Sequence, residues 1–263
     1  MKTRFLIAGL AICASVAAHA AVSLTESTFT EIIKEANVVA AATKAATPAV
    51  THEVFKAPDL VRTGPDSRLE MTAPDKTITR IGENSVFTFE SGQRDIRIEK
   101  GSVLFHPPAG VGGGTIKHGG TAAAVLGTTM LCAVMPDGSF KIIILEGEGT
   151  VTLANGKSVQ LGAGQMVIVS PDGSNFGPLG NVNLAKLVPH LLLVRGFSNP
   201  LSSMPLIEAA IQLQNEQIAA GQDFHFVSLA MAGGGMELIL DQFPNITLLN
   251  TLDQTTVFLS PVR

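Results

Sequence analysis

The sequence predicts a mainly β protein: a rolled antiparallel β-sandwich or a short β-solenoid, with a small C-terminal α/β appendage. Apolar and polar residues alternate with period two through much of residues 60–170, as in half-buried strands. Gly, Pro, Asn and Asp separate these runs and supply the backbone angles that turns need. One run, at 140–145, is almost continuously apolar and β-branched, which indicates a more deeply buried strand.

Composition limits the classes of function. The 263 residues include 18 Lys and Arg, 22 Asp and Glu, 13 Phe, and neither Trp nor Tyr. A hydrophobic fraction of 46% excludes a disordered chain. The missing Trp and Tyr remove the rings on which sugars and bases commonly stack. The mild acidic excess gives no electrostatic reason to expect nucleic acid or anionic lipid as a partner.

Residues 1–20 predict a secretory signal peptide. Lys2 and Arg4 form its positive start, an uncharged apolar run follows, and a small-x-small pattern ends at Ala20. We expect cleavage between Ala20 and Ala21 and a periplasmic or secreted protein. The run is too short for a comfortable transmembrane helix, and no later stretch reaches that length without charge or Pro, so no transmembrane segment is expected in the mature chain.

The two cysteines suggest no disulfide. Cys13 lies within the apolar run and allows a lipoprotein as an alternative, but the bulky Ile12 before it disfavours that cleavage. The mature chain would keep only Cys132, in an apolar strand-like run. We expect a small buried side chain there, because a nucleophile would need a His partner and an exposed, electropositive setting.

Residues 21–53 are a Thr- and Ala-rich lead-in to a β domain at 54–175. Within the lead-in, 29–39 allows either a helix or a strand, and 40–49 predicts a loop. The expected strands of the β domain are 67–71, 77–81, 86–90, 95–99, 102–106, 115–118, 128–135, 140–145, 149–153, 158–161 and 165–169. Turns are expected between them, including one at Lys100-Gly101 and a hairpin at Asn155-Gly156.

A Gly- and Pro-rich stretch at 107–114 predicts a mobile loop, because Pro donates no hydrogen bond and Gly resists ordering. Residues 176–263 form the appended C-terminal region. One helix is expected near 204–220, with Ser203 as its N-cap and Gly221 as its stop. Leu206, Ile207, Ala210, Ile211 and Ile218 would share its apolar face. Residues 224–232 and 236–241 predict strands or helical turns.

Several blocks of the sequence resemble FecR-type extracytoplasmic domains. In the family's order they are VRTGPDSRLE at 61–70, PDKTITRIGENSVF at 74–87, KGSVL at 100–104, GTT at 127–129, LEGEGTV at 145–151 and GAGQ at 162–165. The resemblance covers about residues 54–170, with Lys76 where the family's turn usually has Gly. It implies the fold and an extracytoplasmic location.

The resemblance supplies no catalytic residues. Membrane-bound FecR regulators carry a cytoplasmic anti-sigma segment and a transmembrane helix before this domain, whereas residues 1–20 of this sequence predict a cleavable signal peptide instead. Control of a sigma factor is therefore not carried over.

No catalytic, cofactor-binding or metal-binding set is expected. The glycines of 110–120 lack P-loop spacing, and His106 and His118 have no third ligand close in sequence. Carboxylates of Asp66, Glu70, Asp75, Glu83 and Glu90 fit outward strand positions better than a glycosidase pair.

Three arginines in the β domain lie close to acidic residues in the sequence. They are Arg62, Arg68 and Arg80, near Asp59, Asp66 and Asp75. Local ion pairs and turn capping explain them most simply, and a polar patch that meets a partner is the alternative.

These features favour a non-enzymatic binding or scaffold protein of the bacterial cell envelope. Exposed strand edges would recruit an envelope protein or peptide by strand addition. The alternative is a sensory component that passes a signal to another protein. A carbohydrate-active enzyme is the least expected class, because the chain lacks Trp and Tyr.

Overall fold

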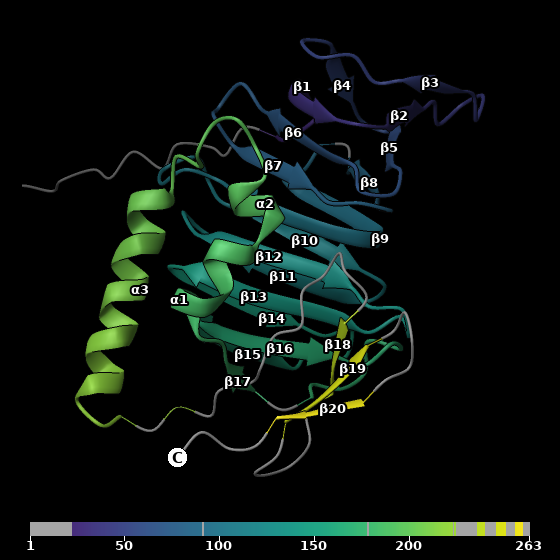
Figure 1. Cartoon of the computed structure of the whole chain (residues 1–263). Helices are drawn as coiled ribbons and strands as arrows, with labels where there is room; N and C mark the ends of the chain where they lie inside the picture. Colours follow the sequence, from purple (N-terminus) through teal and green to yellow (C-terminus); the bar gives the residue numbers. More distant parts are fainter. Residues whose placement is uncertain are drawn as a thin grey trace, which may run out of the picture.

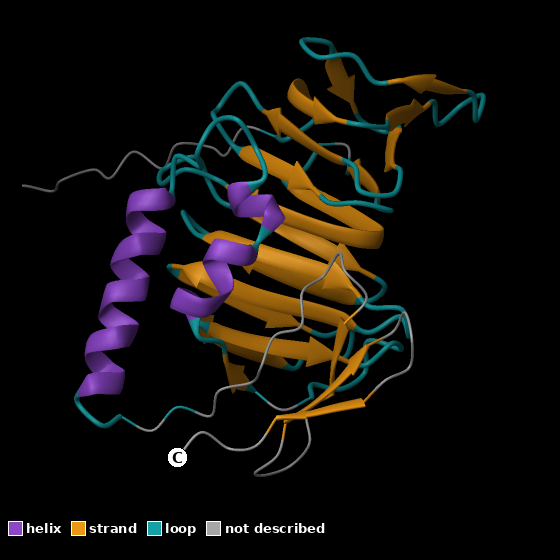
Figure 2. Ribbon diagram, viewed as in Figure 1, coloured by secondary structure: helices purple, strands orange, loops and turns teal. Residues whose placement is uncertain are grey.

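The computed structural model describes residues 23–90, 92–177, 179–222, 224, 236–239, 246–250 and 256–259. Two layers of strands stack against each other, and helices lie on one side of them (Figures 1 and 2). The mainly β fold with a small helical C-terminal part is confirmed. The predicted signal peptide, its cleavage between Ala20 and Ala21, and residues 225–232 and 240–241 lie outside the described residues.

Strands are the main secondary structure of the described chain. They are β1 (Glu26–Ile33), β2 (Ala36–Val39), β3 (Ala46–Pro48), β4 (Val54–Lys56), β5 (Leu60–Thr63), β6 (Arg68–Thr72), β7 (Ile78–Ile81), β8 (Val86–Phe89), β9 (Asp95–His106), β10 (Gly114–His118), β11 (Thr121–Val125), β12 (Thr129–Val134), β13 (Phe140–Glu146), β14 (Glu148–Thr152), β15 (Ser158–Gly162), β16 (Gln165–Val169) and β17 (Gly180–Asn181). A separate antiparallel sheet contains β18 (Met236–Ile239), β19 (Ile246–Asn250) and β20 (Thr256–Leu259).

The first seventeen strands form two layers that share β9. One layer, here called the covered sheet, runs β4-β1-β6-β7-β9-β12-β13-β16-β17. The other, the open sheet, runs β3-β2-β5-β8-β9-β10-β11-β14-β15. Neighbouring strands are antiparallel except β9 and β10, which are parallel.

The turn predicted at Lys100-Gly101 is wrong, because the chain bends there without reversing. The first half of β9 pairs with β8 and β10, and the second half with β7 and β12. Gly101 has φ 86, a left-handed conformation that L side chains rarely adopt. A Cβ on Gly101 would lie 2.0 Å from Ser85 Oγ. Glycine therefore allows one long strand to pass from the open to the covered sheet.

The core has two parts because β13 is buried on both faces. Ile142 and Ile144 point between the two sheets, where Phe55, Phe87 and Phe89 also pack. Ile143 and Leu145 belong instead to a cluster beneath the helices. This double burial is the physical reason for the continuous apolar run at 140–145.

The helices pack on the outer face of the covered sheet. They are α1 (Leu184–Leu187), the 3-10 helix η1 (Val188–His190), α2 (Leu192–Arg195) and α3 (Met204–Ala219). Ser203 is the N-cap of α3 but makes no side-chain capping bond. Leu206, predicted on the apolar face, is 54% exposed, whereas Ile207 is fully buried. Within the described chain, no helix is both long and apolar enough to cross a membrane.

The segment before residue 54 supplies strands to both sheets. β1 pairs with β4 and β6, and β2 pairs with β3 and β5. The uncertain stretch 29–39 is therefore strand, apart from a bend between β1 and β2. The loop predicted over 40–49 contains β3, because the chain reverses after Ala40 and pairs back onto β2.

Candidate functional site

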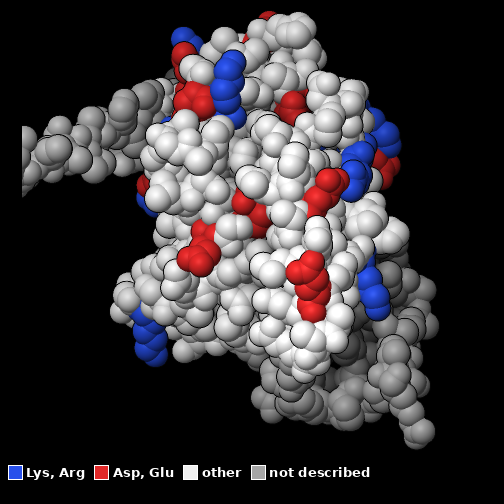
Figure 3. All heavy atoms as spheres, turned by 90° about the vertical axis from the view of Figure 1, so that its left-hand side faces the viewer, with Lys and Arg blue, Asp and Glu red and all other residues white. Residues whose placement is uncertain are grey.

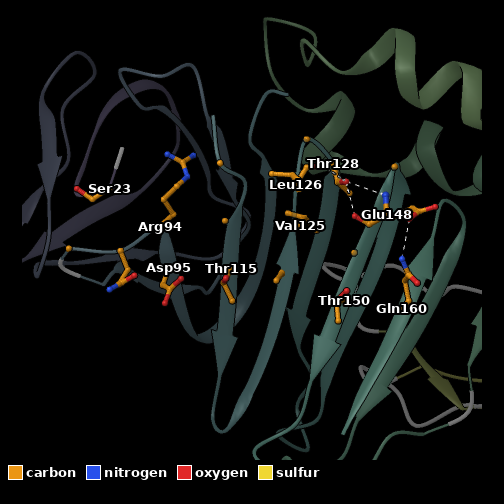
Figure 4. A pocket seen from close by; sticks show the side chains of 18 residues that line it. Ser23, Arg94, Asp95, Thr115, Val125, Leu126, Thr128, Glu148, Thr150 and Gln160 are labelled. Carbon is orange, nitrogen blue, oxygen red and sulfur yellow. Dashed lines mark hydrogen bonds between the residues drawn. The ribbon is translucent and has the colours of Figure 1, made fainter. Parts of the chain in front are cut away.

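A groove of about 830 Å³ lies on the outer face of the open sheet, the layer that the helices leave uncovered. Its floor is one row of residues across five neighbouring strands. The register aligns Asp95, Thr115, Ala124, Thr150 and Gln160 in that order. Figure 4 shows Asp95, Thr115, Thr150 and Gln160 following one another across the strands. Because the central side chains are small, the floor lies close to the backbone.

The turn from β11 to β12 forms one rim of the groove. Thr128 Oγ1 donates to the carbonyl oxygen of Glu148 at 2.8 Å, and the amide of Glu148 lies 3.2 Å from the same hydroxyl oxygen. These contacts hold the turn against the start of β14. Leu126, at the tip of the turn, is 71% exposed. A large apolar side chain therefore stands at the rim without cover from described residues.

The opposite end of the groove is held by Arg94. Its Nε donates to the carbonyl oxygen of Gly113 at 2.5 Å, and its guanidinium pairs with Asp75 at 2.5 Å. Gly113 has φ 69, and a Cβ on it would lie 2.1 Å from the carbonyl oxygen of Val125. Gly110, also in the predicted loop, has open space around it. One end of the Gly-rich loop is thus tightly packed and its middle is not.

Most charges beside the groove neutralise one another. Lys117 pairs with Asp95 at 2.5 Å and with Glu90 at 2.9 Å, and Arg97 pairs with Glu90. Hydrogen bonds from Lys117 and Arg97 lower the pKa of Glu90, and those to Asp95 and Glu90 raise the pKa of Lys117.

Glu148 differs from these carboxylates, because its partner is an uncharged amide. The side chain is exposed, and its Oε2 accepts from Gln160 Nε2 at 3.1 Å. No described Lys, Arg or His lies within ion-pairing distance of it.

The two candidate histidines do not meet. His106 is buried beside Thr129, whereas His118 Nδ1 lies 2.9 Å from the Ile98 carbonyl oxygen and its ring packs on Phe140. Across the described part of the chain, no three His, Cys, Asp or Glu side chains are grouped to hold a metal ion.

The predicted carboxylates each have a local partner. Asp66 pairs with Lys34, Glu70 with Arg80, Asp75 with Arg94, Glu83 with the amide of Asp66, and Glu90 with Lys117 and Arg97. None of them lines the groove. The outward position expected of Glu70 is wrong, because its side chain is buried against Arg80.

Arg80 forms a cross-strand ion pair, as expected for the arginines, but with a different acid and not at the surface. Its partner is Glu70 and not Asp75, and its side chain is fully buried. It also donates to carbonyl oxygens of the helical segment, at Leu193, Val194 and Asn199. Arg80 therefore joins the covered sheet to its helices.

A buried polar network escaped sequence reasoning because its members lie far apart in the chain. Thr129 Oγ1 lies 2.6 Å from Glu146 Oε1, 3.1 Å from His106 Nδ1 and 2.8 Å from Ser203 Oγ. Burial raises the pKa of Glu146 and lowers that of His106, so His106 is neutral at pH 7. Its 3.7 Å contact with Glu146 is then a polar contact and not an ion pair.

The fold and groove define a class of protein: a two-layer β domain with helices on one face and an exposed groove on the other. Residues 59–152 match the family model described as FecR protein, in agreement with the resemblance that the sequence predicts. The match includes most of the groove, from β9 to β14.

Two crystal structures of a candidate anti-sigma factor from Parabacteroides distasonis ATCC 8503 are similar to this chain. Both are 12% identical to it and cover 77% of this chain and 99% of their own, with TM-scores of 0.41 and 0.40. No curated protein matches.

Proposed function

We propose that this protein is a non-enzymatic, signal-transducing component of the cell envelope. The observation that carries the proposal is the FecR match at 59–152, since FecR-type proteins form a regulatory family associated with the envelope. A signalling role fits this match better than a purely structural scaffold, although both work by binding protein.

The exposed groove is the surface we assign to this binding. The helices already occupy the covered sheet, whereas Ala124 and Thr150 on the open sheet are exposed. Small floor side chains and a fixed rim allow another polypeptide to approach the sheet closely.

Site-specific photo-crosslinking in intact cells tests this surface. A crosslinking residue in place of Thr150 should capture a reproducible protein partner, and one in place of Gln212 on the exposed side of α3 should not. The Thr150→Arg variant should lose the transcriptional response that the wild-type gene restores to a deletion strain. Capture without any transcriptional change would favour the scaffold instead. Capture through Ser158 on β15 alone would point to strand addition at that edge.

Export is a further part of the proposal. Ala18→Leu with Ala20→Leu should block processing, because the peptidase accepts only small residues there. N-terminal sequencing of the wild-type protein should begin at Ala21. A lipidated chain that begins at Cys13 would contradict this and establish the lipoprotein alternative.

A further inference from the structure

We infer that the groove binds an extended polypeptide segment that carries a Lys or Arg, with the basic group at Glu148 and an apolar side chain on Leu126. This inference rests on the proposed function and names the chemistry of its partner. Three features of the groove support it: its length, the absence of an ionic partner for Glu148 among the described residues, and its exposed apolar rim.

The floor has the length of a short extended peptide. Its row, from Asp95 to Gln160, crosses four gaps between strands. Strands lie about 4.8 Å apart, so the row is about 19 Å long, which equals about six residues of extended chain. Ala124 and Thr150 in the middle leave room for a backbone to lie flat across the strands.

Charge complementarity selects a basic segment. Asp95 is neutralised by Lys117, and Arg94 by Asp75, so these groups offer no net charge to a ligand. Glu148 is exposed and has only the Gln160 amide as a partner among the described side chains. The Glu148 carboxylate would repel an acidic peptide or a phosphate. A Lys or Arg of the ligand would instead form an ion pair with it.

The apolar rim supplies a second contact. Leu126 is the most exposed large apolar side chain in the described part of the chain, at 71%. It shares a rim with Glu148, because Thr128 ties the β11–β12 turn to the start of β14 (Figure 4). A ligand side chain that covers Leu126 would gain hydrophobic stabilisation beside the ion pair.

A sugar fits the groove less well. The described lining of the groove contains no aromatic ring on which a sugar could stack. The α3 side of the molecule is mostly uncharged, with separate charged groups and no continuous patch (Figure 3). Glu208 and Leu213 on α3 are both exposed and therefore serve as matched controls away from the groove.

Two pools of capped eight-residue peptides test the inference. Both are randomised over Ala, Ser, Thr, Val and Leu, and one has a central Lys where the other has Glu. In fluorescence anisotropy with the mature chain, the Lys pool should bind more tightly. Glu148→Gln should weaken its binding about two- to fivefold, the range of an exposed ion pair, and added salt should do the same. Leu126→Ser should weaken it about tenfold or more.

The controls Glu208→Gln and Leu213→Ser should leave binding unchanged, and circular dichroism should show all four variants folded. Equal binding of both pools, or no effect of Glu148→Gln, would overturn the inference. So would self-association of the mature chain that Glu148→Gln abolishes, because the occupant would then be a second copy. If one of these results is obtained but a crosslinking residue at Thr150 still captures a partner in cells, the proposed function stands and only the inferred chemistry of the occupant is wrong. If the Lys pool binds but no cellular partner exists, the proposed function is wrong.

Discussion

Arg80 and Glu70 form a buried salt bridge of 2.7 Å between β7 and β6 of the covered sheet. Three further bonds run from the same guanidinium to carbonyl oxygens at and beyond the end of α2. Such terminal carbonyls have no partner within their own helix. The Arg80 side chain thus satisfies the end of a helix and fixes it on the sheet, and Phe197 covers the guanidinium at 4.4 Å.

Arg80→Leu should lower the free energy of unfolding by about 3–5 kcal/mol, because it leaves Glu70 buried without its partner. Arg97→Ala removes an arginine from an exposed pair with Glu90 and should cost no more than about 1 kcal/mol. Urea denaturation of the two variants measures the difference. Equal losses would mean that Arg80 contributes little to holding the helical segment.

His106 should make stability fall in mild acid. Its pKa is lowered from 6.5 by burial, so below pH 6.5 the unfolded chain takes up a proton that the folded protein resists. The stability that neutral His106 provides is present above pH 6.5 and lost as pH falls towards its lowered pKa. His106→Gln should therefore flatten the decline in unfolding free energy between pH 6.5 and lower pH, measured by urea denaturation at each pH.

Glu146 should act in the opposite direction. Its pKa is raised from 4.5 by burial, so the folded protein holds a proton that the unfolded chain has released. The stabilising contribution is complete below pH 4.5 and is lost as pH rises through the raised pKa. The free energy of unfolding of Glu146→Gln, minus that of the wild type, should therefore be larger at pH 7 than at pH 4.5. A constant difference across this range would show that the carboxyl keeps its ordinary pKa.

Within the Gly-rich loop, an Ala substitution should reduce stability less at Gly110 than at Gly113. Gly110 and Gly113 have φ of 86 and 69, so an Ala at either site is strained by about 1–2 kcal/mol. Gly113→Ala should cost clearly more, because its Cβ would also meet the Val125 carbonyl oxygen. Thermal melting compares them, with Gly110→Ala as the control. Similar melting temperatures would contradict the tight packing at Gly113.

Cys132 should behave as a buried apolar residue. It is completely buried, and burial raises the pKa of its thiol well above the usual value. Cys132→Ser should cost about 1–3 kcal/mol more than Cys132→Ala, since a buried hydroxyl without a partner is unfavourable. The native thiol should resist a maleimide until the protein is unfolded. Rapid labelling of the folded protein would disprove this placement.

Local sequence pattern predicts a strand where one face of the strand is exposed and the other is buried. The alternating run at 86–90 became β8, and Asn155-Gly156 joins β14 to β15, with Gly156 at φ 82. β11 (Thr121–Val125) was not predicted, because its residues TAAAV carry little alternation or β-branching. It forms a strand because β10 and β14 pair with it on both sides.

Local sequence pattern predicts the fold class, most strands from 67 to 169 and the helix near 204–220, because periodicity and turn residues act over a few neighbouring positions. Which distant residues come into contact depends on how the whole domain packs. Arg80 and Asn199, or Glu148 and Leu126, are brought together by strand order and by the packing of helices on one sheet. Those contacts depend on pairing between residues that are far apart in the sequence, and no short stretch of sequence indicates such pairing.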